Sequence, residues 1–394
     1  MDIAKSIETS DNQNFTVKLN TDRTFHDGTP VKAANFVNAW NYAAYAPNGQ
    51  NGGSFMEPID GYKDLQCPST DKKCASQKPK ADKMTGLNVV DDYTFTIKTS
   101  EPVSNLALRL GYDSFAPLPD SFFKDPKAYE AKPIAAGPYK FVSQDTQSIV
   151  VEKDPAYKGK WAGHSDKITY RIYQADDAAY ADVIANNLDF SDLVPTGMLV
   201  NDQWKTDAKD RNLTAKEGVI QLAAFSPVDD QLKNPTLRKA ISMAINRPEI
   251  TKQVFQGTRA PSDSWVAPTV DGYKAGACGD TCTYNADQAK ALYQQSGGYK
   301  GTLTLAVNGD GGHKPWADAT CNSIKNTLGL DCQVIVTPDF KTLLDQMKNR
   351  EIKGMFRYGW VMDYPSIEDF LTPSTRPALR RTTSTTPTPS STSW

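Results

Sequence analysis

The chain has 394 residues, of which 39% are hydrophobic and 23% are charged, and its formal net charge is −2. This composition is typical of a folded globular protein and excludes a largely disordered chain. The near-neutral charge, without a cluster of lysines and arginines, excludes nucleic acid as an expected partner. No stretch approaches the roughly 18 consecutive apolar residues of a membrane-spanning helix, and the length predicts two or more compact units.

The N-terminal part of the chain predicts strands, one helix and an irregular segment. Apolar and polar residues alternate at 15–19, which predicts a strand. After a turn sequence at 26–30, apolar residues recur at helical spacing over 33–40. Residues 47–90 are rich in Gly, Pro, Asn and Lys and predict irregular structure. A second alternating strand is predicted at 93–97.

The rest of the chain mixes helices and strands. Strands are predicted at 149–151 and 168–172, and a helix at 178–187. An apolar stripe over 237–245 predicts a helix that ends at residues 246–248, because Pro248 disfavours helical backbone at Arg247. From 303 to 360 the pattern is strand, helix, strand, helix, strand, which indicates an α/β unit.

The last 21 residues, 374–394, differ from the rest, because 15 of them are Ser, Thr or Pro. Such a composition cannot build a packed core. We therefore expect a disordered tail.

The cysteines favour an oxidising compartment. The six cysteines fall in three pairs that are close in sequence: Cys67 with Cys74, Cys278 with Cys282, and Cys321 with Cys332. The histidines are isolated from these pairs, which argues against zinc. Three local disulfides are therefore predicted, with six buried free thiols as the alternative, and disulfides would place the protein outside the cytoplasm.

No sequence signature of an enzyme is present. The chain lacks a G-x-S-x-G elbow, a phosphate-binding G-x-x-x-x-G-K-(S/T) loop and an H-E-x-x-H motif. The glycine-rich residues 309–312 lack the lysine and spacing of a phosphate site, and are interpreted as an ordinary loop or a loop beside a ligand. No catalytic residue, metal site or cofactor is predicted.

One segment at the end of the last predicted strand combines an arginine, an indole and an acid: Arg357, Trp360 and Asp363. A carboxylate removed from water must be paired, and an α-ammonium group is a suitable partner. Arg357 could hold a carboxylate through its forked guanidinium. The residues alone therefore fit a zwitterionic ligand, and equally an internal salt bridge between Arg357 and Asp363 with Trp360 in the core.

Five separated segments resemble motifs of one family, the extracellular solute-binding proteins of ABC importers that include dipeptide- and oligopeptide-binding proteins. Residues 25–37 (FHDGTPVKAANFV) resemble F-x-D-G-x-P-(V/L)-T-A-x-D-(F/V), and residues 136–141 (AGPYKF) resemble G-(T/A)-G-P-Y. Residues 234–247 resemble the V-R-x-A-(I/L)…A-(I/L)-D-R helix, and residues 284–290 (YNADQAK) resemble Y-(D/N)-P-x-x-A-K. Residues 359–371 resemble the G-W-x-x-D-Y-P-D-P…F-L block. The segments follow the family order.

The resemblance implies an α/β, two-lobed periplasmic-binding-protein-like fold with an extra inserted subdomain, whose lobes close on a peptide. Residues 1–132 would form the inserted subdomain with part of lobe one, residues 133–228 lobe one, and residues 229–373 lobe two. The resemblance begins some way into the family pattern and stops soon after residue 371. The resemblance therefore implies a chain truncated at both ends, without signal peptide or lipid-anchored cysteine, and an incomplete fold of reduced stability.

The resemblance also implies a binding site and partners. Asp363 matches the acid that receives the peptide α-ammonium, and Gly359 and Trp360 match a strand end that offers main-chain groups to an extended peptide. Arg357 stands where oligopeptide-binding members have a basic residue near the ligand. The expected partners are a peptide and the membrane permease subunits of an ABC transporter, for a monomeric, extracytoplasmic protein without a cofactor.

Other functions remain open at this point. Relatives of this fold carry oligosaccharides or nickel complexes, although three isolated histidines disfavour nickel and seven tryptophans leave sugar stacking open. A hydrolase is a third alternative, which the missing nucleophile motif disfavours. A fragment that binds nothing is a fourth.

Overall fold

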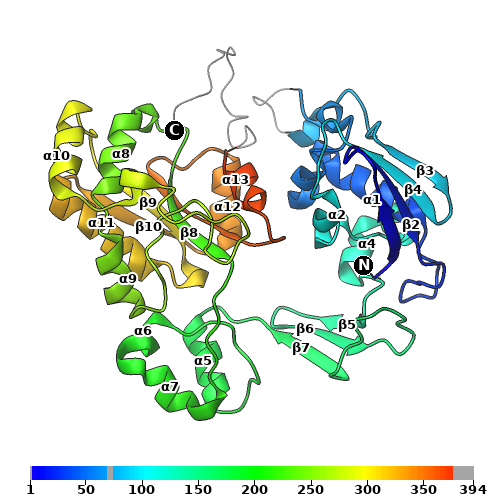
Figure 1. The fold of residues 1–394 in the computed structure, drawn as a ribbon. Coiled ribbons are helices and arrows are strands. Elements are labelled where there is room, and N and C mark those ends of the chain that lie inside the picture. The colour runs from blue at the N-terminus through cyan, green and yellow to red at the C-terminus, as the bar shows by residue number, and fades with distance from the viewer. Residues whose placement is uncertain (1, 69–73, 376–394) are drawn as a thin grey trace. The chain divides into compact units, whose positions relative to one another are not determined.

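A computed structural model describes residues 2–68 and 74–375, and the chain divides into two compact units, Met1–Ile172 and Tyr173–Trp394 (Figure 1). The sequence placed divisions after residues 132 and 228, whereas the compact units divide after Ile172. The assignment of these parts to lobes stays a prediction. The predicted tail, apart from Ser374 and Thr375, lies outside the described residues.

The first unit contains a four-stranded antiparallel sheet in the order β1-β2-β4-β3. Its strands are β1 (Ala4–Glu8), β2 (Asn14–Leu19), β3 (Leu87–Asp91) and β4 (Thr94–Lys98). The helices of this unit are α1 (Ala33–Ala44), α2 (Leu106–Arg109), α3 (Asp120–Lys124) and α4 (Pro126–Ala131). The β2 side chains Phe15 and Val17 are buried with Trp40 of α1 in one core, because alternating residues of β2 and the helical stripe of α1 both face inward.

Asp27 stabilises the turn that the sequence predicted before α1. Asp27 accepts hydrogen bonds from the backbone N–H of Thr29 at 2.9 Å and from its hydroxyl at 2.6 Å. This aspartate caps the turn that leads into the helix.

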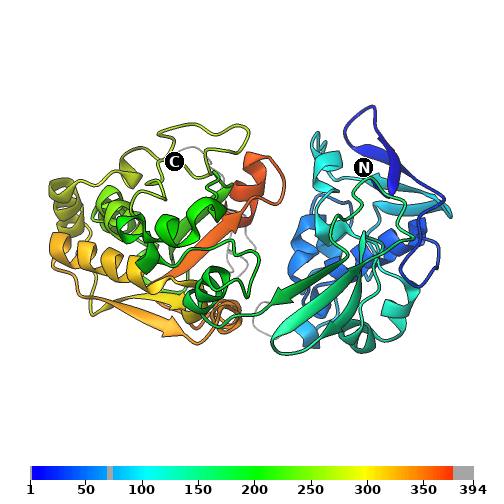
Figure 2. The same cartoon turned by 90° about the horizontal axis from the view of Figure 1, so that it is seen from below.

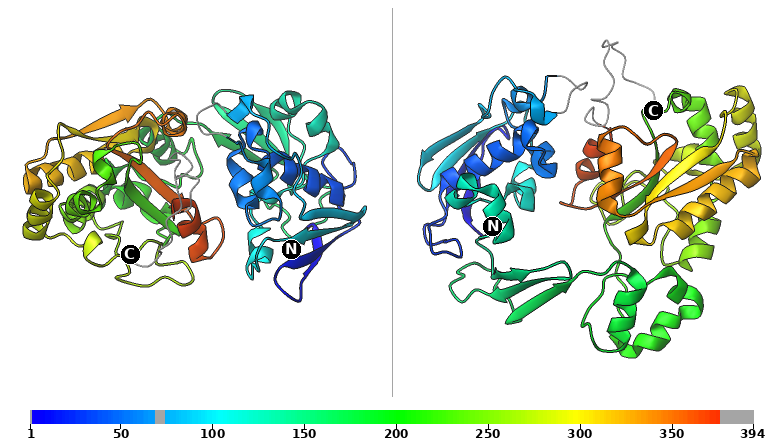
Figure 3. Two further views of the ribbon diagram at one scale, coloured as in Figure 1. Left: turned by 90° about the horizontal axis from the view of Figure 1, so that it is seen from above. Right: turned by 180° about the vertical axis from the view of Figure 1, so that it is seen from behind.

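A separate three-stranded antiparallel sheet completes the first unit, in the order β5-β6-β7. Its strands are β5 (Tyr139–Gln144), β6 (Ser148–Lys153) and β7 (Lys167–Arg171). Figure 3 shows these strands as a sheet of their own. Their side chains are mostly exposed or half-buried, in contrast to those of β2 and β4.

The second unit is built on a four-stranded sheet in the order β10-β9-β11-β8. Its strands are β8 (Val219–Phe225), β9 (Leu303–Asn308), β10 (Cys332–Thr337) and β11 (Met355–Val361). The β9 strand is parallel to β10 and β11, whereas β8 is antiparallel to β11. This confirms the strand, helix, strand alternation predicted for residues 303–360.

Helices cover both faces of this sheet (Figure 2). The helices of this unit are α5 (Asp176–Ile184), α6 (Thr196–Leu199), α7 (Gln203–Ala208), α8 (Pro235–Met243), α9 (Arg247–Phe255), α10 (Ala286–Gln295), α11 (Lys314–Leu328), α12 (Phe340–Lys348) and α13 (Ile367–Thr375). Leu305 of β9 packs with Trp316 and Ile324 of α11 on one face. Ala306 packs with Leu343 of α12 on the other.

The chain between α8 and α9 differs from the prediction in one respect. The first helix does end before Asn246, but Arg247 is the first residue of α9, with Pro248 in the first turn, where a missing N–H costs nothing. The Arg247 side chain is half-buried, and its guanidinium donates to the carbonyl oxygens of Ser242, Ile245 and Cys282. Burial lowers the pKa of Arg247 to about 10.

The structure joins the three predicted cysteine pairs as disulfides, with Cα–Cα distances of 5.7, 5.6 and 4.9 Å. Within residues 2–68 and 74–375, every helix is too short or too polar to span a lipid bilayer.

Candidate functional site

The four predicted site residues lie on β11 or just beyond its carboxyl end, in the second unit. The pairing of β11 with β8 continues from Met355 to Val361, but its pairing with β9 stops at Phe356. From Arg357 onward, therefore, one edge of β11 has no strand partner within the part of the chain that the structure describes.

The hydrogen bonds on the β8 side show which backbone N–H and C=O groups point toward the free edge. The N–H of Met362 donates to the carbonyl oxygen of Gly218 at 2.7 Å, and the carbonyl oxygen of Gly354 accepts from Ser226 at 2.8 Å, both on the β8 side. Backbone groups alternate between the two edges along an antiparallel strand. The N–H and C=O groups of Gly359 and Val361 therefore point toward the free edge.

Gly359 allows β11 to lie close to β8. A Cβ atom at this position would lie 3.1 Å from the carbonyl oxygen of Ile220, closer than such atoms ordinarily approach. The neighbouring residue is fixed from the β8 side, because the side chain of Gln221 donates to the carbonyl oxygen of Tyr358 at 2.8 Å.

Trp360 lies partly in a core and not wholly at a ligand surface. Its side chain packs with Ile220, Val266 and Phe370. The ring of Tyr358 is stacked beside it at a centroid distance of 6.4 Å. The indole therefore anchors β11 to the core and leaves only part of its surface for an aromatic wall.

A second acid accompanies Asp363, and sequence reasoning missed it. The side chain of Asp369, in α13, is 0% exposed, and its Oδ2 accepts the backbone N–H of Asp363 at 2.7 Å. Burial raises the pKa of Asp369, opposed chiefly by the N–H of Asp363 and also by the Trp360 indole and the Asp363 side chain. An acidic group of two carboxyls thus stands at one end of the free edge.

Arg357 lies at the other end of the free edge, and its guanidinium lies over the aromatic ring of Phe340. Its Cζ atom is 4.9 Å from the ring centroid of Phe340, the first residue of α12. Its Nε atom is buried without a hydrogen-bond partner. Burial lowers the pKa of Arg357, and the charge of Asp310 acts against this. The neighbours of the guanidinium are therefore Phe340 and Asp310. The structure does not form the internal salt bridge between Arg357 and Asp363 that the sequence left open as an alternative.

His313, a short distance after β9, lies near Arg357 and Arg259, and sequence reasoning missed it as well. Burial lowers its pKa to about 4, assisted by the charges of Arg357 and Arg259 and opposed by Asp310. Its Nδ1 accepts the indole N–H of Trp316 at 3.2 Å, so the neutral ring carries its proton on Nε2. The loop 309–312 connects β9 to this group.

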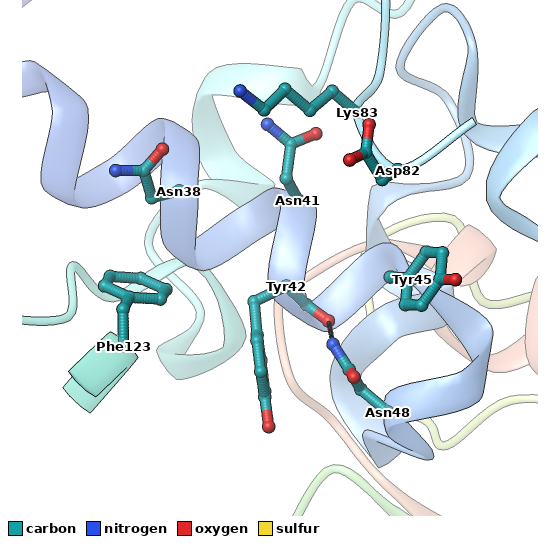
Figure 4. A pocket seen from close by; sticks show the side chains of 8 residues that line it. All are labelled: Asn38, Asn41, Tyr42, Tyr45, Asn48, Asp82, Lys83 and Phe123. Carbon is teal, nitrogen blue, oxygen red and sulfur yellow. Dashed lines mark hydrogen bonds between the residues drawn. The ribbon is translucent and has the colours of Figure 1, made fainter. Parts of the chain in front are cut away.

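A pocket of about 400 Å³ lies in the first unit, beside α1 (Figure 4). Its lining consists of Asn38, Asn41, Tyr42, Tyr45, Asn48, Asp82, Lys83 and Phe123. The Asn48 amide donates to the carbonyl oxygen of Tyr42 at 2.8 Å, and Asn41 Oδ1 accepts the N–H of Met84 at 2.7 Å. None of the predicted site residues lies in this pocket.

One family model matches nearly the whole chain. The model of the bacterial extracellular solute-binding proteins, family 5 Middle, matches residues 1–378. The chain therefore belongs to this family of solute-binding proteins, as the motifs predicted.

Its curated relatives are distant in sequence and longer. The oligopeptide-binding protein OppA of Bacillus subtilis is 22% identical, over 94% of this chain and 68% of that protein. The periplasmic oligopeptide-binding protein OppA of Salmonella typhimurium is 25% identical, with the same two coverages. The dipeptide-binding protein DppE of Bacillus subtilis is 24% identical, over 86% of this chain and 62% of that protein.

Solved structures share the fold. OppA of Burkholderia pseudomallei superimposes with a TM-score of 0.82 at 23% identity, over 94% of this chain and 72% of that one. Haemophilus influenzae OppA in complex with the peptide RPPGFSPFR gives a TM-score of 0.79 at 21% identity, over 94% and 73%. These matches confirm the predicted fold class.

Proposed function

We propose that this protein is the substrate-binding component of an ABC importer and captures short peptides by their main chain and their two ends. Its relatives carry the names of oligopeptide- and dipeptide-binding proteins, and one solved structure of the same fold contains a bound peptide. The protein then acts outside the cytoplasm as a monomer, delivers its ligand to membrane permease subunits, and catalyses no reaction.

The observation that carries this proposal is the free edge of β11. An extended peptide that pairs with Gly359 and Val361 adds one strand to the sheet, and its main-chain hydrogen bonds do not depend on its side chains. Because β9 leaves β11 after Phe356, the added strand takes the place that a continuing β9 would have occupied.

The acidic end of this edge suits a peptide amino terminus. An α-ammonium group is protonated below its ordinary pKa of about 7.7, and a charge-assisted hydrogen bond to Asp363 would replace its lost hydration. The N–H bond to Asp369 holds the Asp363 backbone for this contact.

The basic end suits a peptide carboxyl terminus. The Arg357 guanidinium is desolvated and supported by the Phe340 ring, but its Nε has no partner. Such a group gains more from an incoming carboxylate than an exposed arginine does, because water competes less for it.

The test is isothermal titration calorimetry with one pool of short peptides in two forms, with free amino termini and N-acetylated. We expect the wild type to bind the free form more tightly, and Asp363→Asn to weaken that binding by about 2–5 kcal/mol, the usual cost of removing one partner of a desolvated charge pair. Binding of the acetylated pool should barely respond to this substitution. The same comparison with C-amidated peptides and Arg357→Gln tests the other end.

The control is Asp287→Asn, which removes an exposed carboxylate from α10 of the same unit and should leave peptide affinity unchanged. Equal affinity for free and acetylated peptides would contradict the role of Asp363. Displacement of peptide by cellobiose would favour a sugar receptor. Loss of binding on Tyr45→Ala would move the ligand to the pocket of the first unit.

A further inference from the structure

The pocket beside α1 lies in the first unit, whereas the residues of the proposed peptide site lie in the second. Four of its eight lining side chains follow one another at positions i, i+3, i+4 and i+7 of α1 and its C-cap: Asn38, Asn41, Tyr42 and Tyr45. Such positions share one helical face, and a different face of α1 carries Trp40 into the core. The volume of about 400 Å³ falls within the range of about 300–1,000 Å³ that is usual for small-ligand sites.

Two asparagines of the pocket have a fixed amide orientation, because each uses one end of its amide within the protein. Asn41 Oδ1 accepts the backbone N–H of Met84 at 2.7 Å, so the Nδ2 donors of Asn41 remain for the pocket. Asn48 Nδ2 donates to the carbonyl oxygen of Tyr42 at 2.8 Å (Figure 4), so the Oδ1 acceptor of Asn48 remains. The pocket thus offers a fixed donor and a fixed acceptor on two different residues.

Exposed polar groups and aromatic rings complete the lining (Figure 4). The exposed polar side chains are Asn38, Asp82 and Lys83. The half-buried rings are those of Tyr42, Tyr45 and Phe123. The Tyr42 ring is held by an edge-to-face contact with Phe122 at a centroid distance of 4.8 Å. Polar groups of both kinds therefore stand beside apolar ring surface.

This combination favours a sugar over other small ligands. Each hydroxyl group of a pyranose ring both donates and accepts hydrogen bonds, so it can use a donor and an acceptor on separate residues. A nucleobase is instead recognised by an asparagine that offers both ends of its amide to one base edge, and Asn41 and Asn48 each keep only one end. An organic cation would be repelled by the Lys83 ammonium group.

We propose that this pocket is a second ligand site, which binds one pyranose unit of a saccharide independently of peptide capture in the second unit. The Asn41 and Asn48 amides bind hydroxyl groups of the sugar, and the aromatic walls contact its apolar C–H surface. No residue is shared between the two sites, so sugar binding does not depend on the proposed peptide capture. Because the rim side chains are exposed, the sugar is either free or one unit of a longer glycan chain.

The test is saturation-transfer NMR with the methyl glycosides of glucose, galactose, mannose and N-acetylglucosamine. On irradiation of the protein's aromatic protons, we expect transfer to the ring C–H protons of at least one glycoside. Titration should show that Asn38→Ala and Asn41→Asp each weaken its binding by about five- to tenfold, the effect of one lost hydrogen bond. An aspartate at position 41 can still accept the Met84 N–H but no longer donates to a sugar. The exposed Asn38 keeps the test valid if Asn41→Asp fails to fold.

The control is Asn88→Ala, which removes an exposed asparagine from β3 of the same unit, outside the pocket, and should leave sugar binding unchanged. No transfer to any glycoside, or binding that neither pocket variant weakens, overturns the proposal. Displacement of the sugar by the peptide pool would contradict two independent sites. Comparing the tightest glycoside with an oligosaccharide of the same sugar then identifies the source: tighter binding of the oligosaccharide supports a site for glycan chains, and equal binding supports a site for free sugars.

Discussion

The half-buried His313 and the fully buried Asp369 flank the free edge of β11, and burial shifts their pKa values in opposite directions. Burial and the neighbouring arginines lower the pKa of His313 to about 4, whereas burial raises that of Asp369. Both shifts favour the uncharged form. Burial therefore acts against the charged form of two side chains that lie near the proposed binding edge.

The neutral His313 predicts a loss of stability in acid. The unfolded chain takes up a proton below about pH 6.5, but folded His313 does not until the pH approaches its pKa of about 4. The free energy of unfolding should therefore fall as the pH drops between these values, by about 1–3 kcal/mol after allowance for partial exposure. Denaturant midpoints of the wild type and His313→Gln at pH 7 and 4.5 measure this.

In His313→Gln the acid-induced loss should be smaller by that amount. Asp369 contributes with the opposite sign, since an acid with a raised pKa destabilises the fold as the pH rises above its ordinary value of 3.8. This contribution is common to wild type and variant and cancels in their difference. A variant that loses as much stability in acid as the wild type would contradict a neutral His313.

The sequence predicted the residues of β11 but not those that complete its surroundings. Arg357 and Asp363 could be selected because they stand near one another at a strand end. Asp369 could not, because it lies next to Glu368 on a helix, and a polar residue beside another acid shows no sign of burial in the sequence. His313 is isolated in the sequence, and its position near Arg357 depends on the parallel pairing of β9 and β11, which no local pattern shows.

At the scale of elements, α11 and β10 are joined by the disulfide between Cys321 and Cys332, which closes a loop of 11 residues. Alternation and helical spacing predicted both elements. The strand β8 was missed, because its apolar run VIQLAAF shows no alternation, yet it fixes the paired edge of β11. The strand β1 was missed because its sequence, AKSIE, is too polar to indicate a strand.

The two disulfides of the second unit should differ in their contribution to stability. Replacing Cys321 and Cys332 by alanine should lower the free energy of unfolding by about 3 kcal/mol, since a crosslink restricts the unfolded chain more when its loop is longer. The same change at Cys278 and Cys282, separated by four residues, should cost about 1 kcal/mol less. Urea denaturation of the two double variants measures the difference, and a larger loss for the shorter loop would contradict this order.

At the scale of the whole molecule, each unit has its own hydrophobic core. Trp40 belongs to a cluster formed only by residues of the first unit, and Ile241 to one formed only by residues of the second. Among the described residues no buried cluster contains side chains from both units. Each unit thus meets the basic requirement for folding as a unit.

Separate cores predict two thermal transitions. Trp40 is 1% exposed and donates its indole N–H to the carbonyl oxygen of Phe115 at 2.9 Å, and Ile241 is 0% exposed. Trp40→Ala should lower the free energy of unfolding of the first unit by about 3–5 kcal/mol, and Ile241→Ala that of the second unit by about 2–5 kcal/mol. Each substitution should therefore shift only one of the two calorimetric transitions to lower temperature. A single transition that both substitutions shift would show that the units unfold together.

The free edge of β11 also sets a limit on what this receptor can accept. An open strand edge is a template for any extended chain, including a segment of an intact protein. Under the proposed function, an internal segment brings no ammonium to Asp363 and Asp369 and no carboxylate to Arg357, so it desolvates both ends without neutralising them. The charged ends would thus restrict the edge to chains that terminate there, and the receptor would distinguish the products of protein breakdown from proteins that are still whole.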